Sequence, residues 1–172
     1  KFREDRELTI ILMVDVSASN LFGSTSRTKR EIAAEFASTI ALSASKNNDK
    51  IGLILFSSQI EAFIPPQKGR YHILRIIRDI LFHNPTHQGT NIPLAIDHLN
   101  KILRKKAVVF IISDFIEPNN IDARTFINNN TLNRANPILR KLQLANNRHD
   151  IICTILSDPR ELTFPPIGTL TL

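Results

Sequence analysis

The sequence predicts a three-layer α/β sandwich, in which a mainly parallel β-sheet lies between two layers of helices. Two apolar and β-branched runs, residues 8–14 and 107–112, are typical of strands buried on both faces of a parallel sheet. Helical patterns stand between strand-like runs along the chain, and this alternation predicts parallel strands joined by right-handed crossovers. The 172 residues, 42% of them hydrophobic, fit one domain with a sizeable core.

The first strand is expected over residues 8–16, and a polar loop over residues 20–27 follows it. A helix then opens at Thr28, because Thr28 and Glu31 fit a capping box in which each side chain accepts a hydrogen bond from a free backbone N–H. The helix ends in the polar segment 46–49. Its apolar residues recur at helical spacing and predict one buried face, which consists of Ile32, Ala33, Phe36, Ala37, Ile40 and Ala41.

The next two strands are predicted to form an antiparallel hairpin at one edge of the sheet. They are expected over residues 50–57 and 59–64, and the connection between them is too short for a crossover. Pro65 and Pro66 are expected to stop the second of these strands, because prolines belong at sheet edges.

The rest of the chain continues the alternation of helices and strands. Helices are expected over residues 71–82, 91–104 and 138–146, and strands over residues 107–115 and 150–156. The Asn-rich segment 117–136 is expected to be a surface excursion that is partly helical, and the alternating residues 168–172 indicate the start of a sixth strand.

The formal net charge of +6 is spread over several segments and is not gathered in one stripe. The chain has no Trp and one Tyr, so its basic residues are not interleaved with aromatic residues as nucleic-acid binding would favour. Nucleic acid is therefore not expected as a partner. The basic residues interpreted as solvated surface are Arg27, Lys29, Arg30, Arg75, Arg78, Arg104, Lys105, Lys106, Arg134, Arg140 and Lys141.

The single cysteine, Cys153, is interpreted as a small buried apolar residue, and it excludes an internal disulfide or a multi-cysteine zinc site. A cytoplasmic location is expected. No apolar run approaches the roughly 20 residues of a membrane helix, so no membrane segment is expected in this chain. Residues 1–6 are nearly all charged and are typical of a linker, so the chain is expected to be a piece of a longer protein.

Two acidic residues, Asp15 and Asp114, stand where the two most apolar runs end. Ligands bind at the carboxyl ends of strands in open α/β sheets. Ser17 and Ser19 follow Asp15 at alternate positions, and Thr90 precedes a predicted helix. Each residue alone is more commonly a cap or a turn residue. Together, two carboxylates and three hydroxyls suit a hard divalent cation, Mg²⁺ or alternatively Mn²⁺ or Ca²⁺, with water and an outside carboxylate completing its coordination.

The order Asp15-x-Ser17-x-Ser19, then Thr90, then Asp114 resembles the metal-ion-dependent adhesion site of von Willebrand factor type A domains. More narrowly, the chain is similar to the von Willebrand A-like part of the bacterial "domain of unknown function 58" proteins. The local matches follow the family order along nearly the whole chain: residues 7–9, 22–24, 49–53, 65–66 with Gly69, 89–90, 112–115, 148–150 and 158–161.

The resemblance implies a Rossmann-like sandwich and a metal-ion-dependent protein–protein interaction module, not an enzyme. It implies that Ser17, Ser19 and Thr90 ligate the cation through hydroxyls, while Asp15 and Asp114 act mostly through bound water. The implied partner is a protein that supplies a carboxylate to the metal, and specifically a MoxR-type AAA+ ATPase in the assembly or maturation of bacterial protein complexes.

Two features depart from the family pattern. Asn20 stands where many type A domains have Met, and residues 119–136 form a longer segment than usual.

The competing interpretation is a Mg²⁺-dependent hydrolase of the phosphatase kind. Phosphatases of the haloacid dehalogenase type also place Asp at the end of the first strand, but they use Asp-x-Asp, and here Ser17 stands at the third position. A Ser nucleophile needs a nearby base. The five histidines are expected away from this strand end, and His87, which is nearest, is interpreted as a solvated loop residue. Nucleotide binding is not expected, because the loop after Asp15 has only Gly23.

Overall fold

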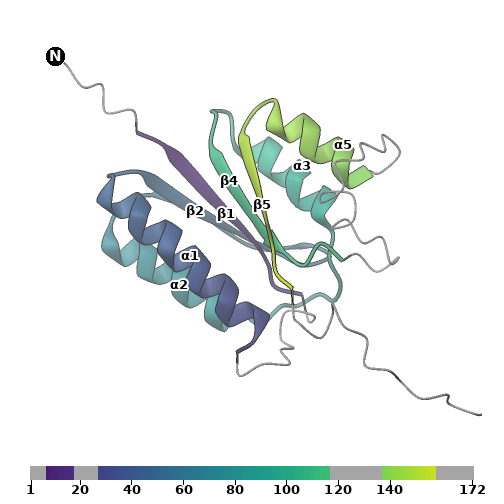
Figure 1. Cartoon of the computed structure of the whole chain (residues 1–172), viewed down its shortest axis with the longest axis horizontal. Helices are drawn as coiled ribbons and strands as arrows, with labels where there is room; N and C mark the ends of the chain where they lie inside the picture. The colour runs from purple at the N-terminus through teal and green to yellow at the C-terminus, as the bar shows by residue number, and fades with distance from the viewer. Residues whose placement is uncertain (1–6, 18–26, 117–136, 158–172) are drawn as a thin grey trace, which may run out of the picture.

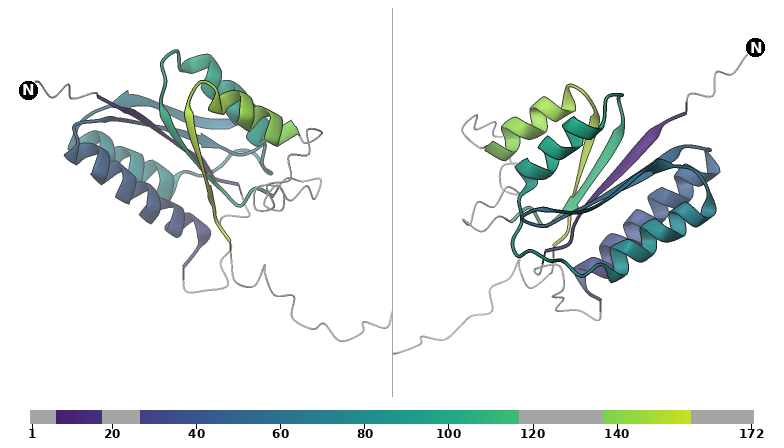
Figure 2. Two further views of the ribbon diagram at one scale, coloured as in Figure 1. Left: turned by 45° about the horizontal axis from the view of Figure 1, so that its top comes forward. Right: turned by 180° about the vertical axis from the view of Figure 1, so that it is seen from behind.

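The computed structural model describes residues 7–17, 27–116 and 137–157, which form a sheet between two helical layers (Figure 1). The described elements are β1 (Thr9–Asp15), α1 (Lys29–Lys46), β2 (Lys50–Phe56), β3 (Ile60–Gln67), α2 (Arg70–Phe82), α3 (Ile92–Ile102), β4 (Val108–Ser113), α5 (Pro137–Asn146) and β5 (Asp150–Ile155). Helices α1 and α2 cover one face of the sheet, and α3 and α5 cover the other (Figure 2). The predicted α/β sandwich is confirmed.

The described strands lie in the order β3-β2-β1-β4-β5, in which β3 is antiparallel and the other neighbours are parallel. The chain leaves β1 toward β2 and later returns to the other side of β1 with β4, so the strand order reverses there. Val14 pairs with Ile112 in this register, and Asp15 therefore ends beside Ser113. Ligands bind at such a reversal point, outside the carboxyl ends of the strands.

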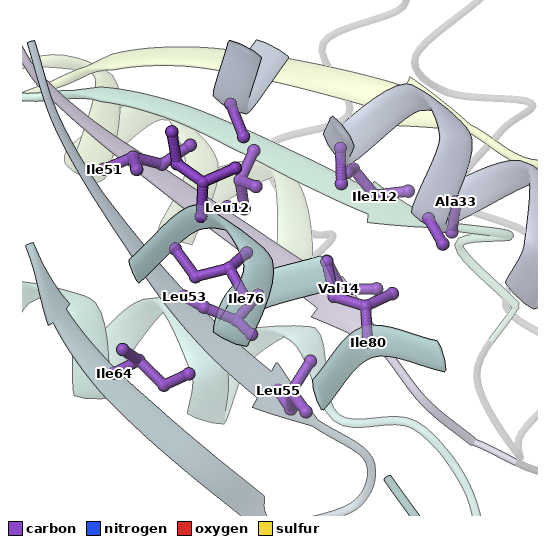
Figure 3. Packing of buried hydrophobic residues seen from close by; sticks show 14 of the residues in the cluster. Leu12, Val14, Ala33, Ile51, Leu53, Leu55, Ile64, Ile76, Ile80 and Ile112 are labelled. Carbon is purple, nitrogen blue, oxygen red and sulfur yellow. The ribbon is translucent and has the colours of Figure 1, made fainter. Parts of the chain in front are cut away.

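Successive residues of β1 point to opposite faces of the sheet and enter two separate apolar cores. Leu12 and Val14 pack with α1 and α2, whereas Ile11 and Met13 pack with α3 and α5. Figure 3 shows part of the first core, where Ile76 of α2 lies over the strands. Burial on both faces explains why residues 10–14 of the strand are all apolar and do not alternate with polar residues.

Thr28 caps α1 as predicted. Its Oγ1 accepts a hydrogen bond from the Glu31 backbone N–H at 3.2 Å, and the Glu31 carboxylate accepts one from the Thr28 N–H at 2.7 Å. The predicted buried face is wrong at Ile32, which is 41% exposed. Small side chains instead line the stripe that lets α1 approach the sheet, and the buried ones are Ala33, Ala34, Ala37, Ala41 and Ala44.

The hairpin of β2 and β3 is confirmed, but the prediction that Pro65 and Pro66 stop β3 is wrong, because β3 continues to Gln67. An edge strand tolerates prolines, since one side of it has no neighbouring strand to receive an N–H. The pairing shifts in register opposite Gly52. A Cβ atom at Gly52 would lie 3.0 Å from the Ile64 carbonyl oxygen, so a larger residue would press against this bulge.

The other predicted elements are confirmed where the structure describes them. Cys153 is half-buried against the second core, and burial raises the pKa of its thiol to about 11, which agrees with an unreactive apolar role. Among the described residues, no helix has both the length and the apolar character that crossing a bilayer requires. The expectations for residues 117–136 and 168–172 lie outside the described residues.

His149 predicts a pH-dependent stability. The residue is 1% exposed at the start of β5, and neither ring nitrogen has a hydrogen-bond partner among the described residues. Burial lowers the pKa of His149, and the charge of Arg148 adds to this effect while that of Asp150 opposes it. The unfolded chain therefore binds a proton more readily, and the free energy of unfolding should fall as the pH drops below the ordinary value of 6.5.

Urea unfolding across the range from about pH 5 to pH 8 tests this expectation. His149→Leu should flatten the pH dependence of the unfolding free energy. Equal pH dependence in the two proteins would contradict the assignment.

Candidate functional site

Asp15, the last residue of β1, is the centre of a buried hydrogen-bond network. Its Oδ2 accepts hydrogen bonds from Ser113 Oγ at 2.7 Å and from Thr90 Oγ1 at 3.1 Å. Its Oδ1 accepts one from the Ser17 backbone N–H at 2.9 Å. All four residues are at most 6% exposed. Two side chains from distant parts of the sequence thus converge on one carboxylate.

The electrostatic environment of Asp15 disfavours its negative charge. Burial raises the pKa of Asp15 above its ordinary value, and hydrogen bonds from Ser113 and Ser17 offset only part of this effect. The charge of Asp114 raises the pKa further. Two carboxylates close together in a buried place favour a positive charge between or beside them.

Asp114 follows β4 and is 1% exposed. Its Oδ1 accepts a hydrogen bond from the Ile116 backbone N–H at 3.1 Å, and its Oδ2 lies 3.3 Å from Nζ of Lys29. Lys29 is the first residue of α1 and is 3% exposed. The interpretation of Lys29 as solvated surface is therefore wrong, because its ammonium group pairs with a buried carboxylate.

The interpretation of Arg30 as solvated surface is also wrong, because this residue is only 8% exposed. Its Nε donates to the Ile80 carbonyl at 2.8 Å, and its Nη2 donates to the His83 carbonyl. Both carbonyls lie at the C-terminal end of α2, where a cation is favoured by the helix dipole. Arg30 thus joins the start of α1 to the end of α2.

The loop between α2 and α3, which carries Thr90, is anchored by Glu61 of β3. The Glu61 side chain is 1% exposed and accepts hydrogen bonds from Ser57 Oγ at 2.6 Å, from the Thr86 N–H and Oγ1 at 3.0 and 2.8 Å, and from the His87 N–H at 3.0 Å. Burial alone would raise the pKa of Glu61, but these hydrogen bonds outweigh it and hold the pKa well below its usual range. The loop is therefore fixed by a charged group.

Asn91 fixes the other side of Thr90. Its backbone N–H donates to the Ser57 carbonyl at 2.9 Å, and its Oδ1 caps α3 by accepting from the Leu94 N–H at 3.0 Å. Ser57 follows β2, which is the neighbour of β1. These contacts hold Thr90 beside the end of β1.

The backbone is strained directly after Asp114. Phe115 has a φ of 57°, a left-handed conformation that bulky residues rarely adopt. Its N–H donates to Ser113 Oγ at 3.0 Å, and its fully buried ring packs in the second core. Strain of this kind persists where the surrounding structure compensates for it, and it is commonest at functional sites.

The structure brings most of the predicted site residues together. Asp15, Ser17 and Thr90 form one hydrogen-bonded group, and Asp114 follows the neighbouring strand. Ser19 lies outside the described residues. Within the described ranges, no three or more His, Cys, Asp or Glu side chains gather as a metal-binding group. A cation here would therefore depend on hydroxyl groups and water as well as on carboxylates.

Sequence reasoning missed two members of this site, Ser113 and Lys29. Ser113 directly precedes Asp114 at the end of a predicted strand, so its position was the available signal. Lys29 follows the helix cap Thr28, and the start of a helix that follows β1 faces the carboxyl edge of the sheet. Lysine is usually exposed in proteins, so the residue type gave no indication that Lys29 would be buried.

The fold and the site define an α/β sandwich with a buried polar cluster at the carboxyl edge of its sheet. Residues 1–172 match the family described as protein of unknown function DUF58, and the chain belongs to this family.

The similar proteins support the fold. The chain is 28% identical over 170 residues to uncharacterized proteins of Mycobacterium bovis and Mycobacterium tuberculosis. The aligned region spans 98% of this chain but only 48% of the length of each relative. The conserved hypothetical protein BatB of Bacteroides thetaiotaomicron has a similar structure, with a TM-score of 0.59, 17% identity, and coverage of 85% of this chain and 65% of BatB. An aerotolerance-related membrane protein of Bacteroides fragilis is also similar in structure, with a TM-score of 0.52 and 20% identity. That match covers 62% of this chain and 54% of the Bacteroides fragilis protein.

Proposed function

We propose that this chain is a von Willebrand A-like, metal-ion-dependent protein–protein interaction module whose metal site is centred on Asp15. The observation that carries the proposal is the convergence of Thr90 and Ser113 on Oδ2 of Asp15, at 3.1 and 2.7 Å. Thr90 lies in the loop before α3 and Ser113 is the last residue of β4, and they meet at the reversal point of the sheet, where α/β proteins bind ligands. A buried second carboxylate, Asp114, follows the adjacent strand.

The chemistry of the donor set fits a hard divalent cation, because every group on offer is a carboxylate or hydroxyl oxygen. Ser17, Ser19 and Thr90 would ligate the ion through hydroxyls. Asp15 and Asp114 would orient those hydroxyls and accept hydrogen bonds from bound water. The bound ion, Mg²⁺ or alternatively Mn²⁺ or Ca²⁺, would keep one coordination position open for an Asp or Glu carboxylate of a partner protein.

The partner we propose is a MoxR-type AAA+ ATPase that acts with this module in the assembly or maturation of protein complexes. The support for this partner is the family resemblance in the sequence. The chain spans about half the length of the curated relatives it matches, at 48%.

The hydrogen bonds at the site favour binding over catalysis. A Ser nucleophile is activated by an adjacent base, which in Ser–His pairs is a histidine. The histidine in the Thr90 loop, His87, directs Nδ1 to Glu61 Oε1 at 3.2 Å and to Thr86 Oγ1 at 2.8 Å. Mg²⁺-dependent hydrolysis of a phosphate ester that is lost in Asp15→Asn would point instead to the hydrolase.

The double variant Ser17→Ala/Ser19→Ala tests the proposal. Removal of two hydroxyl ligands should lower the affinity for Mg²⁺ about tenfold or more, as measured by titration calorimetry. Capture of the purified ATPase by the tagged domain should depend on Mg²⁺, should be lost in EDTA, and should be weak in the variant. Ser43→Ala/Ser45→Ala, with the same spacing on the exposed side of α1, is the matched control. Capture that is unaffected by EDTA and by the site variant would count against the mechanism.

A further inference from the structure

We propose that Lys29 is a resident counter-cation of the metal site, which weakens the binding of a divalent cation alone and makes the loaded site depend on an anionic partner group. This inference rests on the proposed function and describes how its site is regulated. The observation behind it is the ion pair of Lys29 Nζ with Asp114 Oδ2 at 3.3 Å, in which the two side chains are 4% and 1% exposed.

This pair differs from a second ion pair near the start of α1. Arg27 and Glu35 also form an ion pair, at 2.8 Å, but their side chains are 64% and 66% exposed. An exposed pair of that kind contributes little to stability. Burial of a lysine ammonium group carries a desolvation penalty that only a well-placed carboxylate offsets. Lys29 is therefore held at the site by Asp114.

The position of Lys29 on its helix makes the arrangement more unusual. Lys29 is the first residue of α1 after the Thr28 cap. The N-terminal end of a helix carries partial positive charge and disfavours a cation. Both burial and the helix dipole thus oppose a lysine at this position, and the adjacent carboxylate of Asp114 helps to compensate for them. Residues that are kept despite an unfavourable effect of this kind on stability are commonly found at functional sites.

The charges of the three buried groups explain what Lys29 would do. In their ionised forms, Asp15 and Asp114 supply two negative charges and Lys29 supplies one positive charge, so the metal-free cluster keeps one net negative charge. A divalent cation would leave the same cluster with one net positive charge. Without Lys29 the loaded cluster would be neutral. A carboxylate from a partner would neutralise the loaded cluster only when Lys29 is present, so the lysine couples cation binding to partner binding.

Lys29 also competes directly for Asp114. Its ammonium group lies near Oδ2, and Oδ1 already accepts the Ile116 N–H. A cation that draws on Asp114 must therefore displace or share the contact with Lys29. In the absence of metal, the lysine keeps the buried Asp114 charge paired.

The test is a calorimetric titration of MgCl₂ into the wild type, Lys29→Met and the control Lys46→Met. Lys46 lies in the exposed last turn of the same helix. Lys29→Met should bind Mg²⁺ roughly tenfold more tightly, because a nearby positive charge is removed, while Lys46→Met should match the wild type. Acetate, used as a carboxylate probe against chloride at equal ionic strength, should strengthen Mg²⁺ binding more in the wild type than in Lys29→Met.

The metal-free melting temperature of Lys29→Met should fall, because Asp114 loses its partner, and Mg²⁺ should restore it. Lys29→Gln keeps a hydrogen-bond donor without the charge, and it takes the place of Lys29→Met in all titrations if that variant does not fold. Mg²⁺ binding by the wild type with equal or weaker binding by the Lys29 variants would overturn this inference alone. No binding of Mg²⁺, Mn²⁺ or Ca²⁺ by the wild type or the Lys29 variants would overturn the inference and the proposed function together.

Discussion

Asp15→Asn is expected to lower the affinity for Mg²⁺ about 100-fold, with the fold retained. The amide has nearly the same volume as the carboxylate and keeps one oxygen to accept hydrogen bonds. It loses the negative charge on which Thr90 Oγ1 and Ser113 Oγ converge. Even residues that act on a metal through water or through other ligands commonly contribute 10–100-fold to affinity. Titration calorimetry with MgCl₂ measures the loss.

The metal-free stability separates this effect from simple damage to the structure. Asp15 is 2% exposed and lies near the charge of Asp114, so the amide should leave the metal-free melting temperature unchanged or slightly higher. The rise in melting temperature that Mg²⁺ gives the wild type should disappear. Asp150→Asn, at the opposite end of the sheet, should retain that rise. An equal Mg²⁺-induced rise in Asp15→Asn would exclude Asp15 from the site.

The fold was predictable because its strongest determinants are local in the sequence. The apolar runs of β1 and β4 require burial on both faces, and this requirement alone predicts helices on both sides of the sheet. The Thr28 cap was predictable for the same reason, since all of its partners lie within one turn. Pro65 and Pro66 were misinterpreted because the propensity of proline is local, whereas its tolerance at a sheet edge depends on which strand lies beside it.

The candidate site was predictable only in part, because its members meet through the register of the strands. Asp15 and Asp114 were identified because each ends an apolar run. The adjacency of β1 and β4, which brings Ser113 to Asp15, depends on strand order and is invisible to periodicity. Lys29 was misinterpreted because the burial of a charged residue depends on a partner 85 positions away. Residue type alone favoured exposure.

Glu61→Ala is expected to lower the free energy of unfolding by about 2 kcal/mol and to weaken Mg²⁺ binding as well. Hydrogen bonds to a charged group contribute about 1.5–3 kcal/mol, and the Glu61 carboxylate accepts hydrogen bonds from Ser57, Thr86 and His87. The loss should not equal the sum of these bonds, because water can reach the exposed donors of Thr86 and His87 once the carboxylate is gone. Urea unfolding measures the stability.

The same variant tests whether cation binding depends on the hydrogen bonds of Glu61, because Glu61 holds the loop that carries Thr90. A Thr90 hydroxyl that is no longer held near Asp15 should bind a cation less well, by about tenfold. Glu35→Ala removes a carboxylate of an exposed ion pair and should change neither quantity appreciably. The low pKa of Glu61 means that its stabilisation is present above about pH 4.5 and is lost as the pH falls further, so the stability difference between wild type and Glu61→Ala should shrink in acid. A Glu61→Ala protein that loses stability but binds Mg²⁺ as tightly as the wild type would show that the position of Thr90 does not depend on this anchor.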